Sequence, residues 1–546
     1  MADITVLILG GYGVFGGRLA RLLLEDGARV LVAGRSRSRA QNFCRTHGGT
    51  PLITCREDLT AALLHEHGVQ VLIDAAGPFQ AYDTDPYRLA DAAIEAGCAY
   101  LDLSDDAGFT AQIAGLDPAA QAAHVPVISG VSTVPALSAA AVATLGQGLE
   151  QIGLIDTAIL PGNRAPRGLS VMRAILGQAG RPLRLWRGGR WREVPGWSSP
   201  RRIALPGAGS RWASFIGAPD LALFPEHFGA RSVLFRAGLE LRLLHFGLWF
   251  MSIPVRWGVI RSLAPAARPM RWLARCFEPF GTDRGGMRVS VAGRDAAGKP
   301  SLRTWSLIAE EGDGPFIPAI AANLLVKRIA QGTLAPGARA ALADLSLSEV
   351  EDGLARLRVT CSREAEPAPR LFEDALGPKW AELPTPIRRL HDIWDVERFS
   401  GQAQITGAEN PFARLIAAFF RFPRSMAECQ VTVTKTRRPG AETWRRDFGG
   451  PPMVSHLRAL GPGLLEERFG PMRFRLQVDA STSGLSLTIL SGTCLGLPIP
   501  AALLPRTTAR ESVVDGCFRF DVALHAPIVG LLAHYRGWLK PEADEP

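Results

Sequence analysis

The chain has 546 residues, of which 47% are hydrophobic and 21% are charged. This length accommodates about two to four domains, and the composition is that of a globular protein. The formal net charge of +9 invites a nucleic-acid-binding interpretation. However, the arginines are spread along the whole chain, with no helix-turn-helix, zinc finger or aromatic-interleaved basic strand among them. We therefore expect no nucleic-acid partner, and a basic surface that favours an anionic cofactor.

The distribution of cysteines and the first residues of the chain indicate the cellular compartment. The eight cysteines occur singly, without a C-x-x-C pair or a Cys/His cluster at metal-ligand spacing, so we expect no metal site and a reducing environment. The first apolar run is short, follows Asp3 and leads directly into a glycine motif, unlike a secretory signal. These features predict a cytoplasmic protein.

The first motif along the chain is a strand, a glycine turn and the start of a helix. Residues 4–9 form a near-continuous apolar run in which Ile4, Val6 and Ile8 are β-branched, typical of a central parallel strand. The glycines then match G-x-G-x-x-G, which provides a tight turn, close approach of a pyrophosphate to the backbone, and close packing of helix on strand. A helix beginning near Val14 would direct its free N–H groups at that pyrophosphate. The motif predicts a dinucleotide site formed by Gly10, Gly11, Tyr12, Gly13, Val14, Phe15 and Gly16.

The end of the second expected strand, residues 28–33, distinguishes NADP from NAD. An NAD site usually places Asp or Glu there, about 20 residues beyond the glycines, to bind the ribose hydroxyls. This chain has Gly34-Arg35-Ser36-Arg37-Ser38-Arg39 instead. Arg35 offers charge-assisted hydrogen bonds to a 2′-phosphate, and Ser36 adds a hydroxyl donor. We predict NADP as the cofactor; the alternative is that these arginines form only the solvated first turn of a helix.

Helices and strands continue to alternate to about residue 145. The expected helices are 37–47, 59–67 and 86–96, and the expected strands are 52–53, 69–75, 99–103 and 125–129. This order predicts an α/β fold with a Rossmann-type doubly wound parallel sheet, which we assign to residues 1–150. The fourth strand leads into Ala76, Gly77 and Pro78. We expect these residues beside the ribose and nicotinamide, because ligands of open α/β sheets bind at the carboxyl ends of the strands.

Several segments together resemble a known family. In chain order they are 10–16, 33–35, 75–79, 96–102 and 130–135. They resemble the saccharopine dehydrogenase or saccharopine reductase-like family, well over the N-terminal portion and more loosely to about residue 350. The resemblance implies a nicotinamide-dependent oxidoreductase with a Rossmann domain and an inserted α+β domain. It does not name a substrate, because the family also contains trans-acting enoyl reductases and lipid-associated members.

Residues 151–361 break the alternation and predict an α+β substrate or lid domain. Residues 185–192 are typical of a hairpin with a Gly-Gly turn. Residues 287–292 alternate apolar and polar side chains, with an expected partner strand around 305–309. A helix ending near Ile329 is expected to return to the Rossmann domain.

Segment 239–260 is the most apolar part of this middle region. Its longest uncharged stretch, residues 243–255, is well short of the ~20 residues needed to cross a bilayer. Arginines flank it, and Trp249 and Trp257 occupy positions at which an interfacial helix places aromatic residues. Two interpretations stay open: a buried core helix, and a helix that contacts a membrane surface or gates a lipid.

A change of composition marks the C-terminal region. Residues 362–370 are charged, contain prolines and lack large hydrophobic side chains, which predicts a linker. Residues 371–546 contain segments of alternating polarity, near 430–435, 472–478, 485–490 and 518–524, so we expect an α+β domain rich in antiparallel strands. Helices are expected at 411–420 and 527–535. The region resembles a C-terminal domain of unknown function that is fused to such reductases, notably at residues 469–474 and 534–538.

Candidate proton donors must lie at the strand ends beside the nicotinamide. Tyr82 and Tyr87 follow the fourth strand, and Asp102, Asp105 and Asp106 follow the fifth. We select Tyr87 and Asp106 as catalytic candidates; the alternatives are a cleft-wall tyrosine and a helix-capping aspartate. Many relatives have Gly-Glu after the Tyr-x-Asp segment, whereas this chain continues with residues 103–106, Leu-Ser-Asp-Asp, so amino-acid specificity is not carried over.

Two functions from different classes stay open. The first is an NADP-dependent reductase that acts on a C=N, C=O or C=C bond of an apolar or lipid-like small molecule. The second is a non-catalytic NADP-binding protein that is membrane-associated or acts as a scaffold. Saccharopine-type amino-acid chemistry is less favoured because the middle domain is apolar. The sequence leaves open whether the protein touches a membrane peripherally and whether it forms a homodimer.

Overall fold

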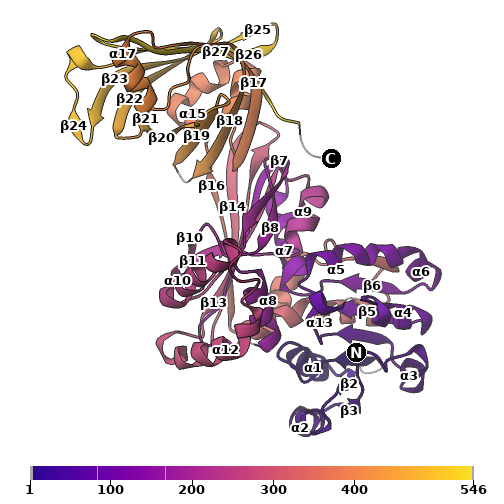
Figure 1. Cartoon of the computed structure of the whole chain (residues 1–546). Coiled ribbons are helices and arrows are strands. Elements are labelled where there is room, and N and C mark those ends of the chain that lie inside the picture. Colours follow the sequence, from indigo (N-terminus) through magenta and orange to yellow (C-terminus); the bar gives the residue numbers. More distant parts are fainter. Residues whose placement is uncertain (1–3, 83, 167, 439, 544–546) are drawn as a thin grey trace. The chain divides into compact units, whose positions relative to one another are not determined.

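The computed structural model describes residues 4–82, 84–166, 168–438 and 440–543, which form two compact units (Figure 1). The first unit comprises residues up to 186, 191–297 and 302–366. The second comprises residues 187–190, 298–301 and those from Pro367 onward.

The first sheet of the first unit is parallel, with strand order β15-β6-β5-β4-β1-β2-β3. Its strands are β1 (Thr5–Leu9), β2 (Arg29–Gly34), β3 (Thr50–Ile53), β4 (Val71–Asp74), β5 (Ala99–Asp102), β6 (Pro126–Ser129) and β15 (Gly337–Ala340). The connecting helices are α1 (Gly16–Glu25), α2 (Arg37–His47), α3 (Ala61–Glu66), α4 (Arg88–Glu95), α5 (Ala107–Gln112), α6 (Asp117–Ala122) and α7 (Ser138–Gly146). All five residues of β1 are buried, as its apolar run predicts. The order of the strands reverses between β1 and β4, which confirms the doubly wound fold.

One strand of this sheet comes from far along the chain. β15 pairs in parallel with β6, so residues 337–340 belong to a sheet that we expected within residues 1–150. The helix that precedes it, α13 (Ile317–Ala330), contacts α1. This contact confirms that the chain returns to the Rossmann domain after the middle region.

The middle sheet of the first unit is mixed, because β12 runs parallel to β7 whereas β13 runs antiparallel to it. Its strands are β7 (Leu149–Leu160), β8 (Pro182–Arg187), β9 (Trp191–Pro195), β10 (Arg201–Leu205), β11 (Gly209–Phe215), β12 (Ser232–Gly238), β13 (Gly285–Asp295), β14 (Pro300–Ala309) and β16 (Val359–Pro367). Its helices are α8 (Leu169–Gln178), α9 (Asp220–Phe228), α10 (Arg242–Met251), α11 (Ile253–Arg256), α12 (Ala267–Cys276) and α14 (Leu347–Leu354). The β8–β9 pairing confirms the expected Gly-Gly hairpin. Residues 362–370 do not form the extended linker that we expected. Most of them belong to β16, which pairs with β14.

The second unit is a closed antiparallel barrel. Its strands are β17 (Val396–Gly407), β18 (Met426–Arg438), β19 (Ala441–Asp447), β20 (Met453–Gly461), β21 (Leu464–Phe469), β22 (Met472–Ser481), β23 (Gly484–Cys494), β25 (Arg506–Val514), β26 (Cys517–Ala526) and β27 (Gly530–Pro541). Pairing of β22 with β23 closes the ring, and the short β24 (Leu497–Pro498) pairs only with β23 among the described strands. Three helices accompany it: α15 (Leu371–Leu376), α16 (Thr385–His391) and α17 (Pro411–Phe419).

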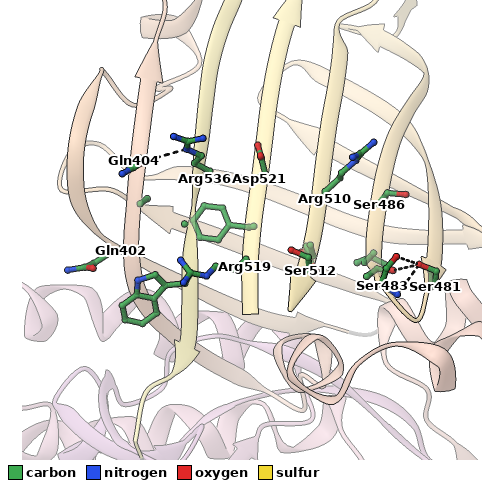
Figure 2. Close-up of a pocket in the computed structure, with 18 of the residues that line it drawn as sticks. Gln402, Gln404, Ser481, Ser483, Ser486, Arg510, Ser512, Arg519, Asp521 and Arg536 are labelled. Carbon is green, nitrogen blue, oxygen red and sulfur yellow. Dashed lines mark hydrogen bonds between the residues drawn. The ribbon is translucent and has the colours of Figure 1, made fainter. Parts of the chain in front are cut away.

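The expected helix at 527–535 was wrong, because Gly530–Pro541 forms β27. A short apolar run fits a strand as well as a helix, and here β27 lies between β17 and β26 and pairs with both. One face of the barrel wall carries the apolar core. The other face of β17, β27, β26, β25 and β23 carries polar side chains, which line a broad hollow of about 910 Å³ (Figure 2).

Candidate functional site

The glycine loop after β1 has no room for side chains. Gly10 has a φ of +81°, and a Cβ added there would lie 2.7 Å from the carbonyl oxygen of Ala75. A Cβ at Gly13 would lie 2.9 Å from the carbonyl oxygen of Gly10, and one at Gly16 would overlap the same oxygen. α1 begins at Gly16 without a side-chain cap, and the N–H groups of Gly17 and Arg18 donate to the carbonyl oxygens of Gly13 and Phe15. The N–H groups available to an anion are those of residues 14–16, at the turn into the helix.

A pocket of about 390 Å³ lies over this loop. Most of the predicted cofactor residues line it: Gly10, Tyr12, Gly13, Val14, Phe15, Arg35, Ala76 and Gly77. Gly11, Gly16 and Ser36 do not line the pocket itself. Pro78 lines an adjoining cavity. The structure therefore gathers residues from three separate strand ends around one pocket.

Tyr12 organises the end of the pocket beyond β2. Its hydroxyl accepts a hydrogen bond of 2.9 Å from the backbone N–H of Ser36, and the Arg39 guanidinium lies 4.8 Å from the centre of its ring. The Ser36 side chain caps α2 by accepting a hydrogen bond from the N–H of Arg39, so this hydroxyl oxygen has a structural role.

Among the described residues, three guanidinium groups line this pocket, those of Arg35, Arg39 and Arg56, against one carboxylate, that of Glu57. Sequence analysis did not select Arg39 or Arg56. Arg39 lies in the arginine-rich stretch after β2, which could have indicated it. No local motif marks Arg56, which the fold brings in from the loop after β3 and which lies 4.2 Å from the centre of the Tyr82 ring. An excess of guanidinium groups is the environment that a 2′-phosphate requires.

Two buried carboxyl groups hold the loops at this edge of the sheet, Asp74 on β4 and Asp102 on β5. Asp74 accepts hydrogen bonds from the N–H of Ala76, at 2.9 Å, and from the Tyr82 hydroxyl, at 3.1 Å. Burial raises the pKa of Asp74 to about 6. The Tyr82 hydroxyl, a candidate proton donor, is thus committed to Asp74 in this structure.

Asp102 ties three backbone segments together through one oxygen. Its Oδ1 accepts hydrogen bonds from the N–H of Ser104 (2.9 Å), the hydroxyl of Ser129 (3.0 Å) and the N–H of Gly130 (2.8 Å). Its Oδ2 is buried without a hydrogen-bond partner. Burial raises the pKa of Asp102 to about 7, so this acid is largely protonated below neutral pH.

The two predicted catalytic residues, Tyr87 and Asp106, make hydrogen bonds that hold the local backbone. The Tyr87 hydroxyl donates to the carbonyl oxygen of Phe109 at 2.7 Å. The Asp106 carboxylate caps α5 by accepting a hydrogen bond from the N–H of Phe109 at 2.8 Å. Neither residue lines the cofactor pocket or the adjoining cavity. The structure thus shows the alternative helix-capping role for Asp106, and it places Tyr87 outside both cavities. Neither residue is carried forward as a catalytic candidate.

A second, largely apolar cavity of about 660 Å³ adjoins the cofactor pocket. The two share Phe15, Ala75, Ala76, Gly77, Ser170 and Val171. Helices α8, α10 and α12 form much of the cavity wall, with side chains such as Met172, Leu244, Met251 and Met270. Its charged lining residues are Asp105 and Asp283. Gly247 on α10 leaves open space, because a Cβ added there would meet no atom within 4 Å.

Segment 239–260 is buried on one side and exposed on another, and its contact with a membrane stays a prediction. One face of α10 lines this cavity or is buried, including Leu244 and Leu248. Leu243 lines the cavity but is 67% exposed, and Phe250 and Trp257, which do not line it, are 70% and 78% exposed. No helix among the described residues is both long and apolar enough to span a membrane. Nor do three His, Cys, Asp or Glu side chains within the described ranges come together as a metal site would require.

The glycine loop, the arginine-lined pocket and the doubly wound sheet define an NADP-binding Rossmann domain. Residues 6–128 match the family model described as saccharopine dehydrogenase NADP binding domain. The N-terminal portion therefore has the saccharopine dehydrogenase-like, NADP-binding oxidoreductase fold. Residues 383–539, in the barrel, match the family model described as a domain of unknown function, DUF4166.

Comparison with solved structures gives two broad but distant likenesses. Apo saccharopine dehydrogenase (L-Glu forming) from Saccharomyces cerevisiae is 15% identical, with a TM-score of 0.48 over 66% of this chain and 100% of that one. A probable dehydrogenase from Thermotoga maritima is 10% identical, with a TM-score of 0.32 over 64% of this chain and 93% of that one. No curated protein sequence matches the chain.

Proposed function

We propose that the first unit is an NADPH-dependent reductase that acts on an apolar, lipid-like small molecule. The observation that supports this proposal is the junction at Phe15 and Ala75–Gly77, where a cofactor pocket meets a cavity of about 660 Å³ with mostly apolar walls. A cavity of this size and lining suits a hydrocarbon substrate rather than an amino acid with several charged groups.

The contribution of the chain to the reaction is positional. When bound, NADPH would supply a hydride to one carbon of a C=C, C=O or C=N bond and become NADP+, while the other atom of that bond would take up a proton from solvent. The glycine loop and Arg35 hold the cofactor phosphates, while Asp74 fixes the loop at Ala76 through its hydrogen bond. The apolar walls of α8, α10 and α12 exclude water and orient the substrate. Within this unit, we propose residues 151–361 as the substrate-covering domain.

We further propose that the substrate enters from a membrane surface. Leu243 and Leu273 line the cavity and are 67% and 43% exposed, so they mark its mouth. Around it, α10–α12 and the following turn expose Phe250, Trp257, Val259, Trp272 and Phe280, with exposed arginines at 242, 261, 268 and 275. Exposed aromatic residues beside arginines are typical of a surface that contacts anionic lipid.

Turnover tests the reductase. NADPH oxidation is measured with medium-chain enoyl, keto and imine compounds and with their short-chain analogues. Gly247→Trp places a large side chain in the cavity and narrows it, which should raise KM for the medium-chain substrate about tenfold or more, with NADPH affinity unchanged. Gly115→Trp, at an exposed glycine that also has no neighbour within 4 Å of an added Cβ, should change neither quantity. NADPH binding without oxidation of any compound would favour the non-catalytic alternative.

Vesicle binding tests the membrane surface separately. Vesicles of phosphatidylglycerol should bind the protein more strongly than vesicles of phosphatidylcholine, and added salt should weaken the binding. The double variant Trp257→Ser with Trp272→Ser should reduce binding, whereas Ile53→Ser, at another exposed apolar side chain of the first unit, should not. Equal binding by both variants would contradict the proposed surface and leave the reductase proposal standing.

A further inference from the structure

The C-terminal barrel has one end closed by helices. β17 begins and β18 ends at this end, and α15 and α16 share the apolar core of the strands there. The carbonyl oxygen of Ala375, on α15, accepts a hydrogen bond from the N–H of Gly463 in the β20–β21 connection. On α16, His391 lies 2.7 Å from a carboxylate oxygen of Glu511 on β25. These contacts seal the closed end.

The interior is less filled toward the other end, which we call the open end. Near the helices, Phe399, Leu465 and Leu485 are buried. Toward the open end, inward-facing aromatic and aliphatic side chains are only partly buried although they line the interior: Phe422, Phe469, Phe474, Leu487, Ile489 and Leu524. They surround a cavity of about 160 Å³. An apolar cavity of roughly 150 Å³ is sufficient to hold an aromatic ring.

Polar groups of the cavity are balanced in charge. Lys435 donates a hydrogen bond to the carbonyl oxygen of Leu390, and Glu511 contacts His391. Arg446 lies 3.5 Å from Glu467. The charged side chains within the cavity are thus Lys435, Arg446, Glu467 and Glu511, beside the Tyr535 phenol. Arg510 also borders the cavity, but its side chain lies on the opposite face of β25 (Figure 2). This balance suits a ligand with a neutral polar end, because a charged end would add an unpaired charge to a largely apolar site.

The connections at the open end expose large apolar side chains. They join β17 to β18, β23 to β25 and β26 to β27. Six of their apolar side chains are 70–92% exposed, and Leu503 is 50% exposed; the six are Phe412, Leu415, Phe419, Leu495, Leu497 and Ile528. At the closed end, the exposed large hydrophobic residues of the strand connections and adjoining strand ends are Leu460 and Val514, at 41% and 48%. Such an apolar rim lowers the cost of transferring an apolar molecule from its source into the barrel.

We propose that the barrel interior is a binding site for one apolar small molecule with a neutral polar end, which enters at the open end. The opposite face of the same strands is polar, as Figure 2 shows for Arg536, Asp521 and Arg510, so the apolar site is confined to the interior. Barrels of this size commonly enclose ligands. The proposal is independent of the reductase, because every residue that carries it lies in the second unit.

The test uses fluorescence titration of the full chain with 2-naphthol, and with 2-naphthoate as a charged analogue of the same ring system. The Gly247→Trp background narrows the cavity of the first unit, and the part of the binding that responds to substitutions at Ala509 and Val522 is assigned to the barrel. We expect 2-naphthol to bind this background at least about tenfold more tightly than 2-naphthoate. Addition of Ala509→Phe, which fills the barrel cavity, should abolish this part of the binding. Thr508→Phe is the matched control, because this neighbouring side chain is exposed on the other face of β25.

A second variant tests the same site without a larger side chain, which the barrel need not accommodate in order to fold. Val522→Thr keeps the shape of a cavity-lining side chain and adds a hydroxyl, which should weaken 2-naphthol binding about threefold or more. Unfolding transitions of all variants establish that the barrel is folded. The proposal is overturned if the background shows no site for 2-naphthol, or if Val522→Thr and folded Ala509→Phe bind it as tightly as the background does.

Discussion

Arg35, Arg39 and Arg56 give the cofactor pocket its positive charge, but they reach it differently. Arg35 immediately follows β2, where an NAD site would have a carboxylate. Arg56 comes from the loop after β3 and lies against Tyr82. We therefore propose that the pocket recognises an additional phosphate through its side chains, and the glycine loop the pyrophosphate through its backbone.

Removal of Arg35 should reduce the preference for NADPH. Arg35→Ala removes a charge-assisted hydrogen bond to the 2′-phosphate, so NADPH affinity should fall about 10- to 100-fold while NADH affinity stays nearly unchanged. Arg37→Ala removes the same charge two residues away, at a side chain that does not line the pocket. Calorimetric titration of both variants with both nucleotides measures the difference. Equal losses for NADPH in the two variants would show that only general surface charge matters.

Asp102 should make the first unit less stable as the pH rises. Its folded-state pKa of about 7 lies above the unfolded value of about 4, so the stability that it contributes is fully present below pH 4 and is lost as the pH rises through 7. Asp102→Asn keeps the accepting Oδ1 but cannot ionise. Between pH 4 and pH 8, the natural chain should therefore lose on the order of 3 kcal/mol relative to this variant.

Urea unfolding of the first unit at a series of pH values measures this difference. Asp352→Asn, at an exposed side chain of α14, is the control and should show the pH dependence of the natural chain. A constant stability difference between Asp102→Asn and the natural chain across this pH range would contradict the assignment of the titration to Asp102.

At the scale of single elements, α16 is held to the barrel by a buried polar cluster. Lys435 lies 3.4 Å from Nδ1 of His391 and can only donate there, so Nδ1 accepts and the Nε2–H donates to Glu511. Burial lowers the pKa of His391, consistent with this neutral tautomer. Burial also lowers the pKa of Lys435, to about 8. The carboxylate of Glu511 balances the remaining charge of Lys435.

Loss of the Glu511 carboxylate should destabilise the barrel. Glu511→Gln leaves the buried Lys435 without this carboxylate, and we expect a loss of about 2–4 kcal/mol in the unfolding free energy of the second unit. Arg510→Gln, the exposed neighbour on the same strand, is the control and should change stability by less than about 0.5 kcal/mol. Denaturant unfolding monitored at the barrel tryptophans measures both. A loss below about 1 kcal/mol for Glu511→Gln would contradict a tethering role.

The features that could be predicted correctly are those specified by residues close together in the sequence. Gly10–Gly16 and Arg35 follow their strands at short, fixed spacings, so the dinucleotide fold and NADP could be inferred from them. β27 was missed because a short apolar run does not distinguish a strand from a helix, and because one of its two partner strands, β17, is distant in sequence. Similarly, β15 joins the Rossmann sheet from residue 337 onward. Arg56 and the cavity walls of α8, α10 and α12 depend on tertiary packing, which no local spacing encodes.

At the scale of the whole molecule, NADPH should stabilise only one of the two compact units. The cofactor pocket lies wholly in the first unit. At a concentration of 100 times Kd, NADPH should therefore stabilise that unit by about 2.7 kcal/mol and leave the barrel transition unchanged. Thermal unfolding of the full chain, with separate probes for the two units, measures this effect. An equal shift of both transitions would show that the units do not respond separately.

A crystal structure of the full chain with NADPH tests the central claim most directly. We predict the pyrophosphate against the backbone of Gly10–Phe15, the 2′-phosphate within hydrogen-bond distance of Arg35, and the nicotinamide at Ala76–Gly77, facing the apolar cavity. A nicotinamide directed away from this cavity would contradict the proposed reduction of an apolar substrate, and a pyrophosphate bound elsewhere would contradict the cofactor site itself.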